Sequence, residues 1–229
     1  MLLTVKDITK ILNVSEKTIY RWVKSGQIPT YRVGEQYRFN RLEILEWATQ
    51  RRIDVAQDIV LTEEAREIRL PTLVEALQNG GIFYRVGGTD KPGALKEVVE
   101  SLRLPDGADR NNLLRIFLAR EELATTATGE GIAIPHVRTP VILHIETPQL
   151  ALCFLENPVD FGALDGNPVY ALFTLICPTI KTHLHLLSRL AFALRDPDFK
   201  ESVRNRVLRE EILAQAARIE EKLAPKDKP

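Results

Sequence analysis

The centre of the chain reads Gly129-Glu130-Gly131-Ile132-Ala133-Ile134-Pro135-His136. The apolar run at residues 132–134 is typical of a short buried strand. Glycines precede this run and a proline follows it, so regular structure breaks beside the histidine. We therefore expect His136 at the end of a rigid element, with its imidazole facing solvent in one orientation. Such an imidazole can act as a nucleophile near neutral pH, whereas the alternative is a histidine that only packs at a strand end.

Further motifs surround this stretch in a fixed order. Upstream lies Arg120-Glu121-Glu122-Leu123 before a Thr-rich turn, and downstream lies Val159-Asp160-Phe161-Gly162-Ala163-Leu164-Asp165-Gly166. A helical pattern then opens at His183 and is followed by Arg195-Asp196-Pro197-Asp198-Phe199. By these motifs, residues 68 to about 215 resemble the enzyme IIA domain of the fructose/mannitol and nitrogen-type branch of the bacterial phosphotransferase system. The resemblance implies a phosphoryl carrier.

The resemblance also assigns roles to single residues. It implies that His136 accepts the phosphoryl group on its ε nitrogen and that His183 lies beside it and hydrogen-bonds to that group. Arg120 matches an arginine near the family's site, and a guanidinium suits phosphate. Arg138 follows at the family's spacing, although a surface charge explains it equally well.

The Thr-rich turn and the residue after His136 depart from the family pattern. Thr126 and Thr128 either add hydroxyl donors to the site or satisfy the turn. Residues 125–128 are not the common Ser-Thr-Gly version, and Val137 stands where the family has Gly or Ala. A residue bulkier than Gly or Ala beside His136 would alter the docking of the partner protein or slow phosphoryl transfer.

We expect no metal centre and no cofactor. His183 and His185 are two residues apart on a predicted helix, so their side chains point to different sides and cannot share one ion. Cys153 and Cys177 lie in apolar, strand-like runs and are interpreted as small buried hydrophobic residues in a reducing compartment.

The first part of the chain is basic. Residues 1–52 hold ten Lys and Arg but only five Asp and Glu. The whole chain has 31 residues of each charge, so the residues after 52 hold 21 Lys and Arg and 26 Asp and Glu. Thr4 and Ser15 are helix caps before apolar-periodic segments, and the second helix is expected at residues 16–24. Two short helices joined by a tight turn are typical of a helix-turn-helix.

Residues 28–39 alternate like two strands around a turn at Gly34, and a further helix is expected from residue 41 to 52. This segment resembles the excisionase/MerR-like winged helix-turn-helix family, in which the second helix enters the major groove and the wing grips the DNA backbone. A solvated basic face is the alternative. The candidate DNA-binding residues are Lys17, Thr18, Tyr20, Arg21, Lys24, Arg32 and Arg38.

The expected fold class is α/β. A small winged helix-turn-helix domain at residues 1–52 precedes a helical linker at 53–67. An enzyme IIA-like domain follows at 68–223, with a mixed sheet flanked by helices, and a tail occupies 224–229. Residues 201–223 are predicted as one continuous charged helix. No apolar run is long enough to cross a membrane and no signal peptide is present, so a cytoplasmic protein is expected.

These features predict a DNA-binding regulator that accepts a phosphoryl group on His136 from an HPr-like phosphocarrier. Such a protein would couple the state of the phosphotransferase system to transcription, with a carrier step of the transferase type. One alternative is a sugar-transport enzyme IIA that passes phosphate to a IIB partner. Another is a transcription factor with a IIA-like scaffold that is not phosphorylated. The expected partners are the phosphocarrier, DNA, an enzyme IIB in the first alternative, and a second copy of the chain.

Overall fold

The structure is a computed structural model that describes residues 3–33, 36–51, 53, 70–136, 145 and 147–223. The chain divides into two compact units, residues 1–69 and 70–229. The predicted linker, apart from Ile53, and the predicted tail lie outside the described residues. The same holds for Val137, Arg138 and the turn at Gly34.

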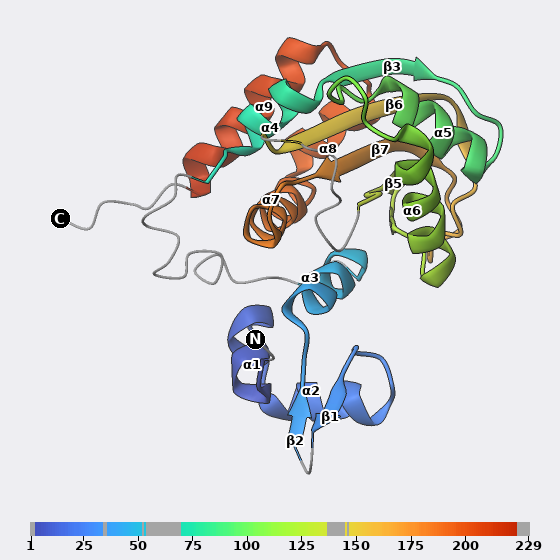
Figure 1. Ribbon diagram of the computed structural model, residues 1–229. Helices are drawn as coiled ribbons and strands as arrows, with labels where there is room; N and C mark the ends of the chain where they lie inside the picture. The colour runs from blue at the N-terminus through green and yellow to red at the C-terminus, as the bar shows by residue number, and fades with distance from the viewer. Residues whose placement is uncertain are drawn as a thin grey trace. The chain divides into compact units, whose positions relative to one another are not determined.

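The first unit, blue in Figure 1, begins with helices α1, Val5–Leu12, and α2, Glu16–Lys24. A capping box between Thr4 and Asp7 starts α1, since each backbone N–H bonds to the other residue's side chain. Ser15 caps α2 through its hydroxyl oxygen. Both helices begin at the predicted residues because these side chains satisfy N–H groups that a helix start leaves unpaired.

The two strands predicted for the wing are β1, Tyr31–Val33, and β2, Gln36–Arg38, which pair antiparallel. Helix α3, Arg41–Gln50, follows. Trp22 of α2 and Trp47 of α3 meet edge to face with ring centroids 5.1 Å apart. The core of this unit is formed by buried apolar side chains that include Ile8, Ile11, Leu12, Ile19, Ile28, Phe39 and Ile44.

The second unit is built on a five-stranded mixed sheet, as predicted. Its strands are β3, Ile82–Val86; β4, Ala127–Gly129; β5, Ile132–Ala133; β6, Gln149–Val159; and β7, Val169–Ile176. They lie in the order β3-β6-β7-β5-β4. The β3–β6 and β5–β7 pairs are parallel, and the β6–β7 and β4–β5 pairs are antiparallel.

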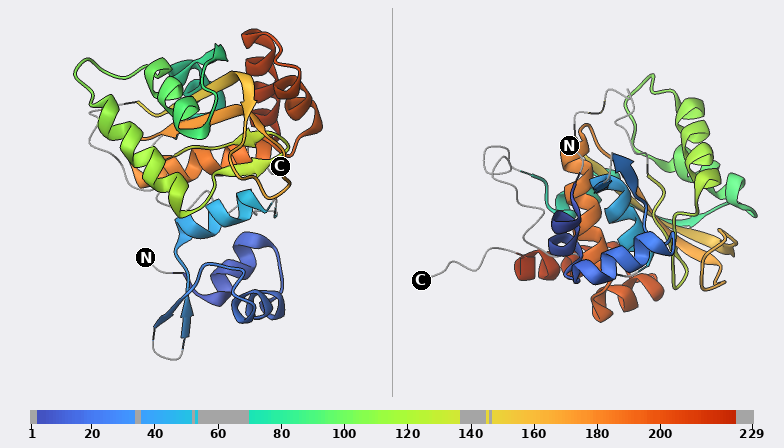
Figure 2. Two further views of the ribbon diagram at one scale, coloured as in Figure 1. Left: turned by 90° about the vertical axis from the view of Figure 1, so that its right-hand side faces the viewer. Right: turned by 90° about the horizontal axis from the view of Figure 1, so that it is seen from below.

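Helices cover both faces of this sheet (Figures 1 and 2). On one face, α5, Lys91–Ser101, and α6, Arg110–Leu123, pack on inward side chains such as Cys153, Leu155 and Leu172. On the other lie α4, α7, α8 and α9, with Phe199 of α8 against Phe173 of β7. Alternate strand residues thus enter two cores, as expected for a sheet buried on both sides. These helices are α4, Leu73–Gly80; α7, Ile180–Ala193; α8, Pro197–Arg204; and α9, Arg209–Leu223.

The prediction of one continuous helix over residues 201–223 is wrong. Helix α8 ends at Arg204, Arg206 takes a left-handed conformation with φ of 50°, and α9 begins at Arg209. The chain turns back there, so that α9 lies along α8. Arg218 Nη2 of α9 is 2.5 Å from Oδ1 of Asp196, the residue that caps the start of α8. Both helices can then bury an apolar face, which one straight helix could not do against the same core.

Among the described residues, no helix is long and apolar enough to span a membrane. The prediction that both cysteines are buried is confirmed. Burial raises the pKa of Cys153 and of Cys177 to about 12, so neither thiol ionises readily.

Candidate functional site

The hairpin of β4 and β5 brings the chain to His136. Gly131 opens β5 with φ of +76°, and a Cβ at this position would lie 2.4 Å from the ring of Tyr170. Only glycine accommodates both the left-handed conformation and this close approach. β5 then pairs with β7, and the Leu175 N–H donates to the Pro135 carbonyl at 3.1 Å. These bonds place His136 beside Leu175, at the end of the strand as predicted.

The ring of His136 has a defined tautomer. Its Nδ1 lies 2.7 Å from the carbonyl oxygen of Ile134. A carbonyl oxygen only accepts hydrogen bonds, so Nδ1 carries the proton in the neutral ring. The lone pair is therefore on Nε2, which is the nitrogen that can act as a nucleophile.

His183 lies against His136. It belongs to the first turn of α7, which Thr179 caps by accepting the N–H of Thr182. The two imidazole centroids are 5.2 Å apart, with an angle of 43° between the rings. The His183 ring is therefore one of the neighbours of His136 within the second unit.

Arg120 and Glu121 hold the turn that precedes β4. Arg120 is buried at the end of α6 and donates from Nη1 to the carbonyl of Ala124 at 2.9 Å. Glu121 is also buried and accepts from Thr126, both from the backbone N–H at 3.1 Å and from the hydroxyl at 2.6 Å. The end of α6 is thus tied to the hairpin that carries His136.

The two threonine hydroxyls bond within the hairpin and its turn, which is the second of the two interpretations above. Thr126 donates to Glu121, and Thr128 donates to the carbonyl of Ile132 at 3.2 Å. Glu121 received no role from the sequence, although it stands in a motif that the sequence does single out. The only signal was an acidic residue shortly before a Thr-rich turn, which is too common to decide a contact.

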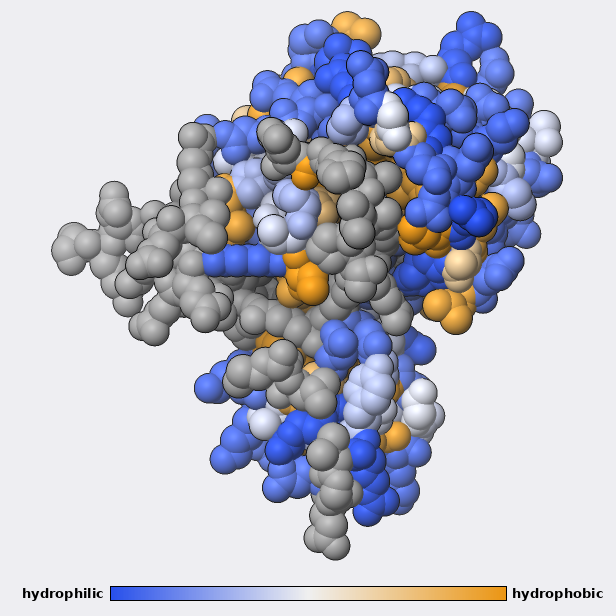
Figure 3. Space-filling model, viewed as in Figure 1, coloured by the Kyte–Doolittle hydropathy of each residue, from blue (hydrophilic) through white to orange (hydrophobic). Residues whose placement is uncertain are grey.

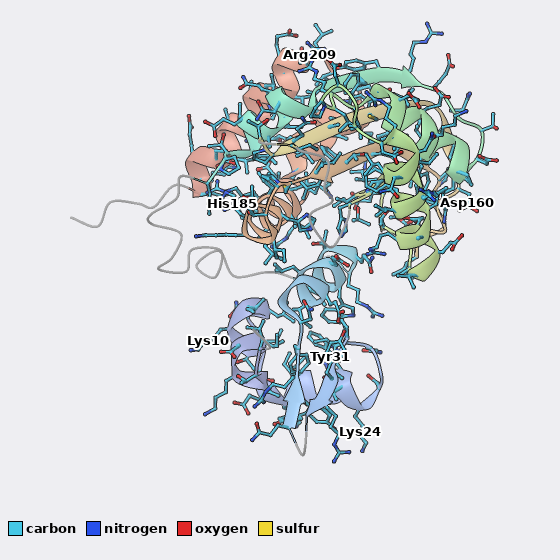
Figure 4. The ribbon with its side chains drawn as sticks, viewed as in Figure 1. Lys10, Lys24, Tyr31, Asp160, His185 and Arg209 are labelled. Atoms are coloured by element: carbon cyan, nitrogen blue, oxygen red, sulfur yellow. The ribbon has the colours of Figure 1, made fainter. Side chains whose placement is uncertain are left out.

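His185, on α7 in Figure 4, takes no part in the His136 pair. Its Nε2 lies 2.9 Å from the carbonyl oxygen of Pro71. Burial lowers the pKa of His185 to about 4, and the charge of Arg189 adds to this effect. The ring is therefore neutral at physiological pH and donates Nε2–H to Pro71.

The first unit presents basic side chains along α2. Lys17, Arg21 and Lys24 are exposed and recur at helical spacing, so they lie on one face, while Ile19 is fully buried on another. Arg32 of the wing is exposed as well. In Figure 3 the visible face of this unit is mostly hydrophilic. An exposed basic stripe on the second helix suits the phosphates of DNA.

The other candidates of this unit make internal contacts. The Thr18 and Ser15 hydroxyls lie 3.0 Å apart at the cap of α2. Arg38 donates to the Gln36 side-chain oxygen at 2.5 Å. Tyr20 is 48% exposed and packs edge to face on Tyr37 of the wing, with centroids 6.1 Å apart. Tyr20 therefore connects the second helix to the wing.

Comparison with known families places both units. Residues 75–217 match the model described as phosphoenolpyruvate-dependent sugar phosphotransferase system, EIIA 2. The chain belongs to this family. Residues 2–52 match the model of a helix-turn-helix domain. The resemblances stated from the sequence motifs are thereby confirmed.

Relatives of the EIIA domain include nitrogen regulatory proteins. The chain is 36% identical over 137 residues to the nitrogen regulatory protein of Pseudomonas aeruginosa, which covers 58% of this chain and 86% of that protein. It is 35% identical over 116 residues to the nitrogen regulatory protein of Bradyrhizobium diazoefficiens, which covers 50% and 74%. The crystal structure of the nitrogen regulatory protein IIA-Ntr from Neisseria meningitidis superposes with a TM-score of 0.52 at 28% identity, covering 59% of this chain and 92% of that one.

Within the EIIA domain, the structure brings two of the four predicted site residues together, His136 and His183. Arg120 is placed at the turn before the hairpin, where it bonds to Ala124. Arg138 lies outside the described residues.

Proposed function

We propose that this protein is a DNA-binding regulator whose EIIA domain accepts a phosphoryl group on His136 Nε2 from an HPr-like phosphocarrier. The bond between His136 Nδ1 and the Ile134 carbonyl carries the proposal, because it leaves the lone pair on Nε2. The family membership of residues 75–217 supports the choice of phosphoryl transfer over other histidine chemistry.

The transfer needs no external reductant, oxidant or hydrolytic water. The Nε2 lone pair of His136 attacks the phosphorus of the carrier's phosphohistidine, and the new P–N bond forms as the old one breaks. The electron pair of the broken bond returns to the carrier's imidazole nitrogen. The Nδ1 proton stays on His136, where the Ile134 carbonyl stabilises the positive charge that the ring gains.

His183 is suited to stabilise the transferred group. Its ring lies 5.2 Å from that of His136, centroid to centroid, so a phosphoryl group on Nε2 would come within reach of a ring N–H.

The helix-turn-helix domain would bind DNA through the exposed cations of α2 and through Arg32. One small module binds weakly, so we expect a homodimer on two half-sites. Phosphorylation adds about −1.5 to −2 charges at the histidine pair. We propose that this charge changes the affinity for DNA.

The test is phosphate transfer from phosphoenolpyruvate through enzyme I and a cognate HPr-type carrier. With labelled phosphoenolpyruvate, we expect labelled phosphate on the wild type and none on His136→Ala. DNA affinity is then measured for both states on duplexes selected from a random pool. No label with any cognate carrier would remove the carrier function, and equal DNA affinity in both states would remove the coupling. Release of label to an added enzyme IIB would instead favour a sugar-transport role.

A further inference from the structure

We propose that Glu121 is a positioning residue for His136, acting through the hydrogen bonds of the hairpin rather than by touching the phosphoryl group. This inference rests on the proposed function, which it deepens by naming what holds the nucleophile. It joins the end of α6 to the imidazole ring in three steps, each a contact of 3.1 Å or less.

The first step is the pairing of Glu121 with Thr126. Both carboxylate oxygens lie 3.1 Å from the Thr126 nitrogen, and Oε2 also accepts the Thr126 hydroxyl at 2.6 Å. Both side chains are buried. A buried carboxylate that accepts two donors from one residue fixes both the position and the orientation of that residue.

The second and third steps run along the hairpin to the imidazole ring. The carbonyl of Thr126 accepts the N–H of Ile134 at 3.0 Å. The carbonyl of Ile134 in turn accepts Nδ1–H of His136 at 2.7 Å. Ile134 thus bonds to Thr126 through its N–H and to His136 through its carbonyl. A shift of Thr126 therefore moves the Ile134 carbonyl, which selects the tautomer of His136.

The carboxylate itself is held from the other side. Lys91 Nζ lies 3.5 Å from Glu121 Oε1 and sits over the ring of Phe161, 5.6 Å from its centroid. The Thr125 hydroxyl donates to the Phe161 carbonyl at 2.7 Å. A charged partner and a fixed neighbouring turn keep Glu121 in place, so its position is set by more than one element.

The consequence for transfer follows from the two tautomers. When Nδ1–H is bonded to Ile134, every neutral His136 ring carries its lone pair on Nε2 in a fixed direction. Without that bond a free imidazole places a proton on either nitrogen and rotates. Loss of Glu121 should therefore lower the fraction of rings that are ready to react and misdirect the rest.

The test compares Glu121→Ala, Glu121→Gln and Thr126→Val with a matched pair elsewhere in the same domain. Thr72 and Glu75 form a capping box at the start of α4, in which the carboxylate also accepts a threonine N–H, at 2.9 Å. Glu75→Ala removes the same kind of contact from a helix that carries neither His136 nor His183. Each variant is measured for phosphate transfer rate, thermal stability and the His136 tautomer, the last by long-range ¹H–¹⁵N NMR.

We expect Glu121→Ala to slow transfer about ten-fold and to mix the His136 tautomers. Glu121→Gln keeps one acceptor oxygen and should recover part of the rate. Thr126→Val, which keeps the shape of the side chain, should act in the same direction if Glu121→Ala does not fold. Glu75→Ala should lower stability while leaving the rate and the tautomer unchanged.

The proposal is overturned if the Glu121 and Thr126 variants keep a wild-type tautomer, or if Glu75→Ala slows transfer equally. Its failure is distinguishable from that of the proposed function. A wild type that accepts no phosphate refutes the carrier role, whereas the tautomer measurement still decides whether Glu121 positions the ring.

Discussion

The imidazoles of His136 and His183 meet at a centroid distance of 5.2 Å although they come from a strand end and a helix start. Neither element sets this distance alone. The β5–β7 pairing places His136 beside Leu175, and α7 begins shortly after β7 ends. The same strand thus positions both histidines.

This pair predicts unequal effects for the histidines of the EIIA domain. We expect His136→Ala to abolish transfer and His183→Ala to slow it by about 10² to 10³, the usual cost of removing a preorganised donor. His185→Gln, on the same helix, should leave the rate near wild type because His185 bonds to Pro71 instead. Rapid-quench transfer assays measure these rates, and a wild-type rate for His183→Ala would contradict the assigned role.

Binding to DNA should depend on salt through the cations of α2. Replacing Lys17, Arg21 and Lys24 with Gln should make the slope of log K against log salt less steep, by about 0.9 for each phosphate that the variant no longer neutralises. Fluorescence anisotropy on a random-sequence duplex measures this slope. Lys10→Gln, an exposed cation on α1, is the matched control and should change it little. An unchanged slope in the triple variant would exclude α2 as the surface that binds DNA.

Stability should fall in mild acid because of His185. Its pKa is about 4 in the folded protein against an ordinary value of 6.5, so the unfolded chain binds more protons between these pH values. The stabilisation is complete above pH 6.5 and is lost as the pH falls to about 4, a change of about 3 kcal/mol.

Urea unfolding at several pH values across this window measures the loss. His185→Gln retains an amide donor for the Pro71 carbonyl but does not titrate. The difference between wild type and variant should therefore vary with pH over this window, and parallel curves would refute the prediction.

The close approach of Gly131 to Tyr170 predicts a large cost for one added methyl group. Gly131→Ala should destabilise the domain by roughly 3 kcal/mol or more, through left-handed strain and overpacking together. Gly166→Ala is the matched control, because its φ is +69° and its Cβ would meet nothing within 4 Å. It should cost only about 1 to 2 kcal/mol. Thermal unfolding measures the loss of stability in the two variants. Adding Tyr170→Ala should restore part of the stability lost in Gly131→Ala, but none of that lost in Gly166→Ala.

Local sequence patterns predicted most helices and strands because their signals are local. Thr4 and Ser15 cap helices through bonds to residues three positions away. The β5 strand, Ile132–Ala133, falls within the apolar run predicted at residues 132–134, since glycines precede this run and a proline follows it. The pattern failed at residues 205–208, where a charged helical period continues through a turn. Only packing of α9 back along α8 explains the break there.

By itself, the sequence determined the helix-turn-helix and EIIA character of the two parts and the placement of His136 at a strand end. These rest on caps, periodicity and motifs, which neighbouring residues decide. The tertiary structure decided which groups meet: His183 against His136, Pro71 at His185, and Glu121 at Thr126. Such contacts depend on strand register and helix docking, which arise from burial of the whole core and not from any one stretch of chain.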